Sequence, residues 1–102
     1  MDPEIPDLIS LADVVQSTAG RDQGTCFYVI KEDDRYLYLV NGKDRPLDKP
    51  KHKKRKHVQK VLRSETRVAQ KLRAGDKVLN GELRRDLAFL CQNMQSNNLG
   101  GF

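Results

Sequence analysis

The chain has 102 residues, of which 37% are hydrophobic and 32% are charged, and it contains no tryptophan. This length suits a single small domain with a modest core. An acidic beginning argues against a signal peptide, and no run approaches the roughly twenty apolar residues that cross a membrane. We therefore expect a cytoplasmic protein without membrane partners.

The net charge of +5 is unevenly distributed along the chain. Residues 1–42 have a balance of −5, residues 43–63 of +8 and residues 64–102 of +2. A separate basic block of this kind is typical of proteins that bind a polyanion.

The first half of the chain predicts short strands. Residues 1–8, rich in proline and acids, are expected to form a flexible lead, and Leu8–Val15 to contain the first strand. Gly20 and Gly24 bracket a turn, because glycine adopts positive φ without steric cost. The run Thr25–Lys31 follows it and is rich in the aromatic and β-branched residues that strands prefer.

Further strands are expected at Tyr36–Val40, at Arg45–Leu47 on an edge, and at His57–Leu62 as a closing strand. Between the last two, residues 49–57 form a basic segment, read as a loop or arm. About five short strands are the number of a small barrel. One face of such a sheet fills the interior, and an appended helix can cover the other.

Residues 64–95 predict a two-helix extension. Ser64 can cap the first helix and Gly75 can end it, while Asn80 can cap the second. The second helix carries an apolar stripe, which favours packing in the core, with a partner or dimer surface as the alternative. The stripe consists of Leu83, Leu87, Leu90, Cys91 and Met94. Residues 96–102 are expected to form a flexible tail.

The sequence offers no recognisable catalytic or metal-binding pattern, so we expect neither an enzyme nor a cofactor. His52 and His57 have no cysteine or carboxylate at metal-ligand spacing. The two cysteines, Cys26 and Cys91, each lie in an apolar run and are expected to be buried free thiols, because a disulfide would need an oxidising compartment.

The basic segment is the strongest chemical feature, and lysine and arginine bind phosphates through charge without reading sequence. Exposed tyrosines could stack on bases, but core or half-buried strand positions are favoured for Tyr28, Tyr36 and Tyr38. In the turn, Asp22 is expected to bond local backbone and to leave Arg21 free to project. The expected RNA contacts are Arg21, Lys43, Arg45, Lys51, Lys53, Lys54, Arg55, Lys56, His57 and Lys60.

Residues 12–62 resemble a KOW-motif domain, similar to KOW-type large-subunit ribosomal proteins of archaea and eukaryotes. The resemblance rests on Val14-Val15, the turn 19–24, Phe27–Ile30, Tyr36–Val40, Asn41-Gly42 and the lysine-rich segment ending Lys56-His57-Val58. It implies an SH3-like barrel, here over residues 9–63, a structural role for Gly24, binding to RNA, most plausibly ribosomal, and no catalysis. We expect a monomer. KOW barrels also resemble parts of transcription elongation factors, so a ribosomal or polymerase protein partner is the alternative.

Overall fold

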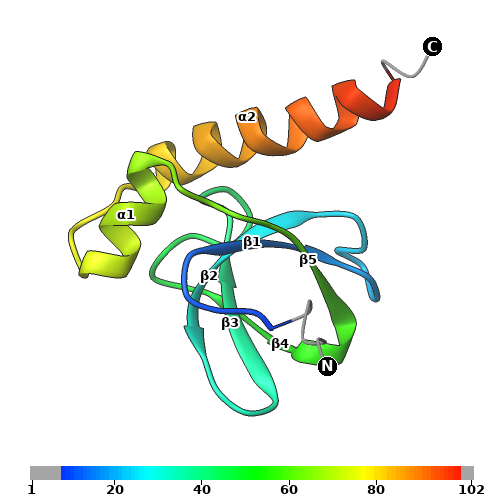
Figure 1. Ribbon diagram of the computed structural model, residues 1–102. Helices are drawn as coiled ribbons and strands as arrows, with labels where there is room; N and C mark the ends of the chain where they lie inside the picture. Colours follow the sequence, from blue (N-terminus) through cyan, green and yellow to red (C-terminus); the bar gives the residue numbers. More distant parts are fainter. Residues whose placement is uncertain (1–7, 100–102) are drawn as a thin grey trace, which may run out of the picture.

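A computed structural model describes residues 8–99 of the chain, and the surroundings of the side chains from Leu8 to Cys91. Within that part, five strands form one antiparallel sheet in the order β4-β3-β2-β1-β5, and two helices follow (Figure 1). The strands are β1 (Asp13–Ser17), β2 (Cys26–Glu32), β3 (Tyr36–Val40), β4 (Lys51–Lys54) and β5 (Val58–Arg63). A single 3₁₀ turn, η1 (Arg55–His57), joins β4 to β5, and the helices are α1 (Arg67–Ala74) and α2 (Asn80–Leu99). The prediction of a mainly β protein with two C-terminal helices is confirmed.

The basic segment forms a strand, and this corrects the prediction of a loop or arm. β4 pairs with β3 along its length, with Tyr36 opposite Lys54 and Tyr38 opposite His52. The edge strand expected at Arg45–Leu47 is absent from this described segment, which is a loop instead. The Asn41 side chain accepts hydrogen bonds from the backbone N–H groups of Lys43 and Arg45, both at 2.9 Å, and holds the loop.

The first strand begins at Asp13, later than the sequence indicates. The Asp13 carboxylate accepts a hydrogen bond from the backbone N–H of Ser10 at 2.8 Å, and the Asp13 N–H donates to the Ser10 carbonyl at 3.0 Å. Ala12, inside this turn, has a φ of 69°. The polar side chain thus stabilises a turn in a stretch whose apolar composition suggested a strand.

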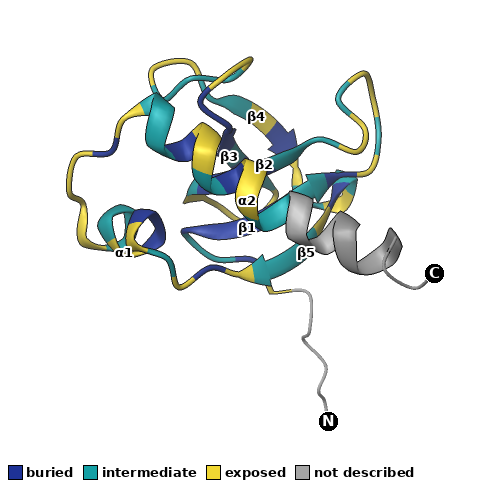
Figure 2. Ribbon diagram, turned by 90° about the horizontal axis from the view of Figure 1, so that it is seen from above, coloured by how far each residue is buried: buried dark blue, intermediate teal, exposed yellow. Residues whose placement is uncertain are grey.

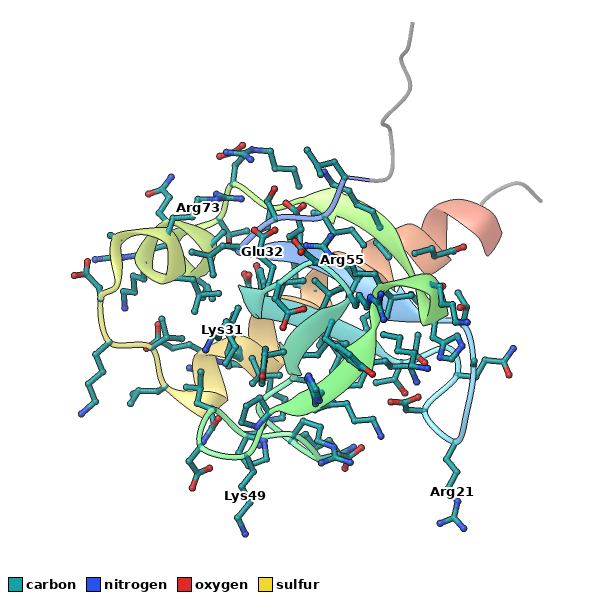
Figure 3. All side chains as sticks on the ribbon, turned by 90° about the horizontal axis from the view of Figure 1, so that it is seen from below. Arg21, Lys31, Glu32, Lys49, Arg55 and Arg73 are labelled. Carbon is teal, nitrogen blue, oxygen red and sulfur yellow. A yellow bond between two sulfur atoms is a disulfide. The ribbon has the colours of Figure 1, made fainter. Side chains whose placement is uncertain are left out.

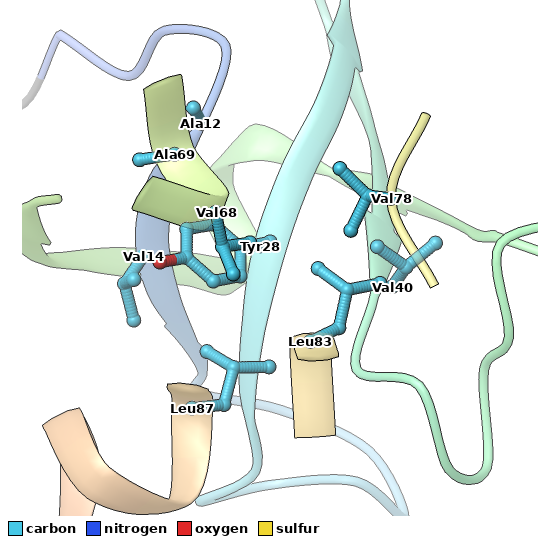
Figure 4. Packing of buried hydrophobic residues seen from close by; sticks show 9 residues of the cluster. All are labelled: Ala12, Val14, Tyr28, Val40, Val68, Ala69, Val78, Leu83 and Leu87. Atoms are coloured by element: carbon cyan, nitrogen blue, oxygen red, sulfur yellow. The ribbon is translucent and has the colours of Figure 1, made fainter. Parts of the chain in front are cut away.

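Both faces of the sheet carry buried residues, as expected. Alternate residues of one strand point to opposite faces and therefore belong to two different hydrophobic clusters. Phe27 and Val29 belong to an inner cluster with Leu37 and Leu39. Tyr28, between them, belongs to the outer cluster that the helices cover (Figure 4). This arrangement explains why the strands carry large residues at consecutive positions.

The apolar stripe of α2 forms part of the outer core. Leu83 and Leu87 are buried against the sheet, and Leu90 packs at the edge of the same cluster. Figure 2 shows α2 crossing the sheet with exposed positions on its outer side. The helix continues to Leu99, so residues 96–99 are helical and were wrongly predicted as tail. The side chain of Met94, the lead 1–7 and residues 100–102 lie outside the described parts.

A buried polar network fastens the helices to the sheet. The Tyr28 hydroxyl donates to the Asp86 carboxylate of α2 and contacts Ser64 Oγ at 2.8 Å. Burial, together with the hydrogen bond to Asp86, raises the pKa of Tyr28 to about 12. Ser64 is therefore a partner of Tyr28, and Thr66 caps α1 in its place, with its hydroxyl oxygen accepting from the Ala69 N–H at 3.2 Å.

Cys26 and Cys91 form a disulfide between β2 and α2, so the prediction of two free thiols is wrong. The two residues are 65 positions apart, and the sequence carries no signal of how α2 is placed on β2. Because cytosolic glutathione keeps thiols reduced, the pair would exist in a cytoplasm as two adjacent thiols.

Across residues 8–99, neither helix has the length and apolar character needed to cross a membrane.

Candidate nucleic-acid interface

The alternation of β4 divides its side chains between two faces. Lys51 and Lys53 lie opposite Leu39 and Leu37 on the inner face, and His52 and Lys54 point the other way. Lys53 is only 8% exposed, and its ammonium donates to Asp22 Oδ1 and to the Ala19 carbonyl, both at 2.7 Å. Lys53, which the sequence indicated as an RNA contact, therefore holds the turn between β1 and β2.

The Gly20–Gly24 turn is built around this ion pair. Gly20 and Gly24 have φ of 87° and 90°, which supports their predicted structural role. The Asp22 carboxylate accepts from Ser17 Oγ at 2.8 Å as well as from Lys53, rather than from local backbone N–H groups as expected. Burial opposes ionisation of Asp22, but these hydrogen bonds outweigh it and lower the pKa of its carboxyl.

Two further predicted contacts are engaged in ion pairs within the chain. Arg55 lies 3.0 Å from Glu32 and donates to the Asp33 carbonyl at 2.8 Å, and Figure 3 shows Arg55 beside Glu32. Lys60 lies 3.2 Å from the buried Asp13 carboxylate. The charges of Arg55 and Lys60 are therefore partly neutralised by acids of the same chain.

The turn cluster, defined here as Arg21, Arg45 and Lys51, is the first group of predicted contacts that folding brings together. The three residues come from the β1–β2 turn, the β3–β4 loop and the start of β4, and they line one hollow of about 300 Å³. Asp22 and Asp44 line it too, so its charge is mixed. Arg21 is exposed and extends away from the turn (Figure 3).

The strand-end cluster, defined here as Lys54, Arg55 and Lys56, is the second group. With Arg35 and Tyr36 these residues line a hollow of about 320 Å³. Arg55 and Lys56 also border a neighbouring hollow of about 550 Å³ that reaches Lys60. The end of β4 and the following turn thus gather cations at the end of the sheet that lies farther from α2 (Figure 1).

The two remaining predicted contacts lie apart from these hollows. Lys43 is exposed on the β3–β4 loop. His57 ends η1 and is partly buried, and its carbonyl accepts from the Thr18 N–H at 2.8 Å.

An aromatic stack on the outer face of β3 and β4 was not predicted. His52 lies between two tyrosines, with ring centroids 4.2 Å from Tyr36 and 4.8 Å from Tyr38. Tyr28 is fully buried, and Tyr36 and Tyr38 are partly buried on β3, so all three tyrosines occupy the core or half-buried strand positions that were favoured. The alternation of Tyr36–Val40 could have placed both tyrosines on one face, but the partner strand that completes the stack had been taken for a loop.

Among the residues whose side chains are described, no three histidine, cysteine or acidic side chains converge in a way that could hold a metal ion. No protein-family model matches the chain, and no curated protein matches it either.

Proposed function

We propose that this chain is a non-catalytic RNA-binding protein of the KOW type, associated with the ribosome in the cytoplasm. It grips structured RNA through backbone phosphates. The observation that carries the proposal is the gathering of cations from β4, η1 and the neighbouring loops around two hollows, one lined by the turn cluster and one by the strand-end cluster. No active site is needed for this role, because charge and counterion release supply the affinity.

The strand order supports the SH3-like barrel that this proposal includes. The first four strands form a meander, and β5 returns to pair with β1. β4 and β5 lie at opposite ends of the strand order, yet only the three residues of η1 join them. Such a connection requires a strongly curved sheet, as a barrel has.

Six of the predicted contacts remain available for phosphates. These six residues form no ion pair with any residue whose side chain is described. The six are Arg21, Lys43, Arg45, Lys51, Lys54 and Lys56. Neutralising about four to six phosphates gives a slope of roughly −3 to −5 in log affinity against log salt.

A different explanation for a lysine-rich edge strand is protection against pairing with another sheet. That explanation covers Lys51 and Lys54 on β4, but it does not account for Arg21 or Arg45. These arginines lie on loops and line one hollow together with Lys51. Phosphate binding accounts for both groups.

The alternative of a protein-interaction module used the stripe of α2. Leu83 and Leu87 are buried inside the chain, so they cannot at the same time present a surface to a partner.

The test is the affinity for a structured ribosomal RNA fragment over a range of salt concentrations. We expect Lys51→Gln, Lys54→Gln and Lys56→Gln together to reduce both the affinity and the slope. The matched control, Arg67→Gln, Lys77→Gln and Arg84→Gln, removes three exposed charges from the helical side and should change neither greatly. A flat salt response, or equal losses in the two triple variants, would contradict the proposal.

Association with the ribosome has its own test. The endogenous protein should sediment with ribosomal particles at low salt and be released as salt is raised. Sedimentation as free protein at every salt concentration would contradict a ribosomal role while leaving RNA binding itself open to the first measurement.

A further inference from the structure

The Tyr36–His52–Tyr38 stack, called here the aromatic platform, lies on the face of the sheet that continues from the helix-covered core. Tyr36, Tyr38 and Val40 alternate along β3 and share this face. Val40 is buried in the outer cluster with Val78 and Leu83 from the helical region. Tyr36 and Tyr38 come before Val40 in the strand and are not members of that cluster. His52 beside them is exposed.

The platform is surrounded by cations. Lys31 places its ammonium 5.3 Å from the centre of the Tyr38 ring, and Lys54 lies opposite Tyr36 across the β3–β4 pair. Arg35 and Lys56 line the same hollow as Tyr36. Aromatic faces within reach of several cations are the combination that single-stranded nucleic acids bind, since bases stack while phosphates are neutralised.

Two of the three acids near the platform, Glu32 and Asp33, are already engaged in ion pairing or turn formation. Glu32 pairs with Arg55. Asp33 accepts hydrogen bonds from the backbone N–H groups of Tyr36 and Arg35, at 2.8 and 3.0 Å, and these bonds lower the pKa of its carboxyl. With Asp34 included, the segments 31–35 and 54–56 contain three carboxylates and five cations, at residues 31, 35, 54, 55 and 56, so their summed charge is positive.

We propose that the aromatic platform stacks unpaired bases of the bound RNA. This inference rests on the proposed function, and it adds that the target contains single-stranded nucleotides next to its helical part. The strand-end cluster then holds the phosphates on either side of the stacked bases. Cross-strand aromatic pairs also stabilise a sheet by themselves. A stabilising role alone, however, would give no preference between RNAs of equal charge.

The experiment compares two RNAs with the unaltered full chain. One is a fully paired hairpin, and the other has the same number of phosphates but carries part of them in a single-stranded overhang containing 2-aminopurine. We expect the overhang RNA to bind about 5- to 150-fold more tightly, the range for stacking of one base. The 2-aminopurine fluorescence should fall on binding, because stacking quenches it.

Two variants separate stacking from charge. His52→Leu leaves an apolar side chain at this exposed position but removes the aromatic ring between Tyr36 and Tyr38. This variant should lower the affinity for the overhang RNA and leave the affinity for the paired hairpin unchanged. The control, Lys54→Gln, should weaken binding of both RNAs by a similar factor.

The outcomes distinguish this inference from the proposed function. Equal salt-dependent affinities for the two RNAs, with unchanged 2-aminopurine fluorescence, would overturn stacking but leave phosphate binding in place. The absence of salt-dependent binding to either RNA would overturn both.

Discussion

Lys53 and Lys54 are neighbours with the same charge, yet the structure assigns them opposite roles. Lys53 is 8% exposed and is paired with Asp22, whose side chain is 21% exposed, whereas Lys54 is exposed and has no ion pair with any described side chain. Replacing each residue separately by methionine removes one charge and keeps an unbranched side chain of similar length. The pair of variants therefore tests whether position alone determines the effect.

We expect Lys53→Met to cost about 2–3 kcal/mol of unfolding free energy. Exposed ion pairs contribute about 0–1 kcal/mol, and removal of one partner from a fully buried pair costs about 3–5 kcal/mol. The Asp22–Lys53 pair lies between these limits because Asp22 retains some contact with solvent. At about 4–8 °C per kcal/mol for a domain of this size, the melting temperature should fall by about 10–20 °C.

Lys54→Met should change the stability by less than about 0.5 kcal/mol, as expected for a surface position. It should instead weaken RNA binding and reduce the salt slope by about 0.7–0.9. Urea unfolding followed by circular dichroism gives the stability, and RNA titrations over a salt series give the slope. Equal destabilisation by both variants, or a larger binding loss for a stable Lys53→Met protein, would refute the assignment.

The same pair predicts a dependence on pH. The pKa of Asp22 is lowered in the folded chain, so its contribution to stability is complete above 3.8, the usual value for aspartate, and is lost as the pH falls through the lower folded value. The unaltered protein should therefore lose more stability than Lys53→Met on acidification below about pH 4. A larger acid loss in the variant would contradict this sign.

Three further predictions concern the fold. In Gly42→Ala the new Cβ would overlap the Asn80 carbonyl oxygen, whereas in Gly24→Ala the new Cβ would meet no atom within 4 Å. Thermal melts should show the Gly42→Ala variant to be far less stable, with Gly24→Ala costing only about 1–2 kcal/mol of unfolding free energy. Equal losses in the two variants would contradict the close packing of the β3–β4 loop on α2. Tyr28→Phe should cost about 1–3 kcal/mol in urea unfolding, because the buried partners of the Tyr28 hydroxyl lose a hydrogen bond. An ultraviolet titration of the unaltered protein should show one tyrosine ionising near pH 12, and the protein should lose stability as the pH rises from 10 through that value. Reducing the Cys26–Cys91 bond should lower stability by up to about 4 kcal/mol, the chain-entropy estimate for a loop of 65 residues; a thiol assay that finds two reactive cysteines in oxidised protein would count against the bond.

The strands β2 and β3 were predictable because burial on two faces leaves a continuous run of apolar and aromatic residues in the sequence. Tyr36–Val40 was located to the residue, and β2 was displaced by one position. β4 was missed because its four residues, Lys51–Lys54, contain no apolar side chain. Its pairing is determined by β3, which offers an unpaired edge after a loop held by Asn41.

The candidate site was predictable as a composition but not as a geometry. The sequence indicated that residues 49–57 are basic and could not separate Lys53 from Lys54, because this separation depends on which face of a strand each side chain occupies. The convergence of Arg21 and Arg45 on β4 likewise depends on the curvature of the sheet. The place of His52 beside Tyr36 and Tyr38 was not predictable, because stacking with these rings requires the strand pairing.

Mapping RNA contacts by amide chemical shifts during a titration with the structured ribosomal RNA fragment tests the central claim most directly. The account predicts that the largest changes occur in β4 and η1 and at Arg21 and Arg45, and that they are reversed by added salt. Changes concentrated on α2, with β4 and η1 unaffected, would contradict it.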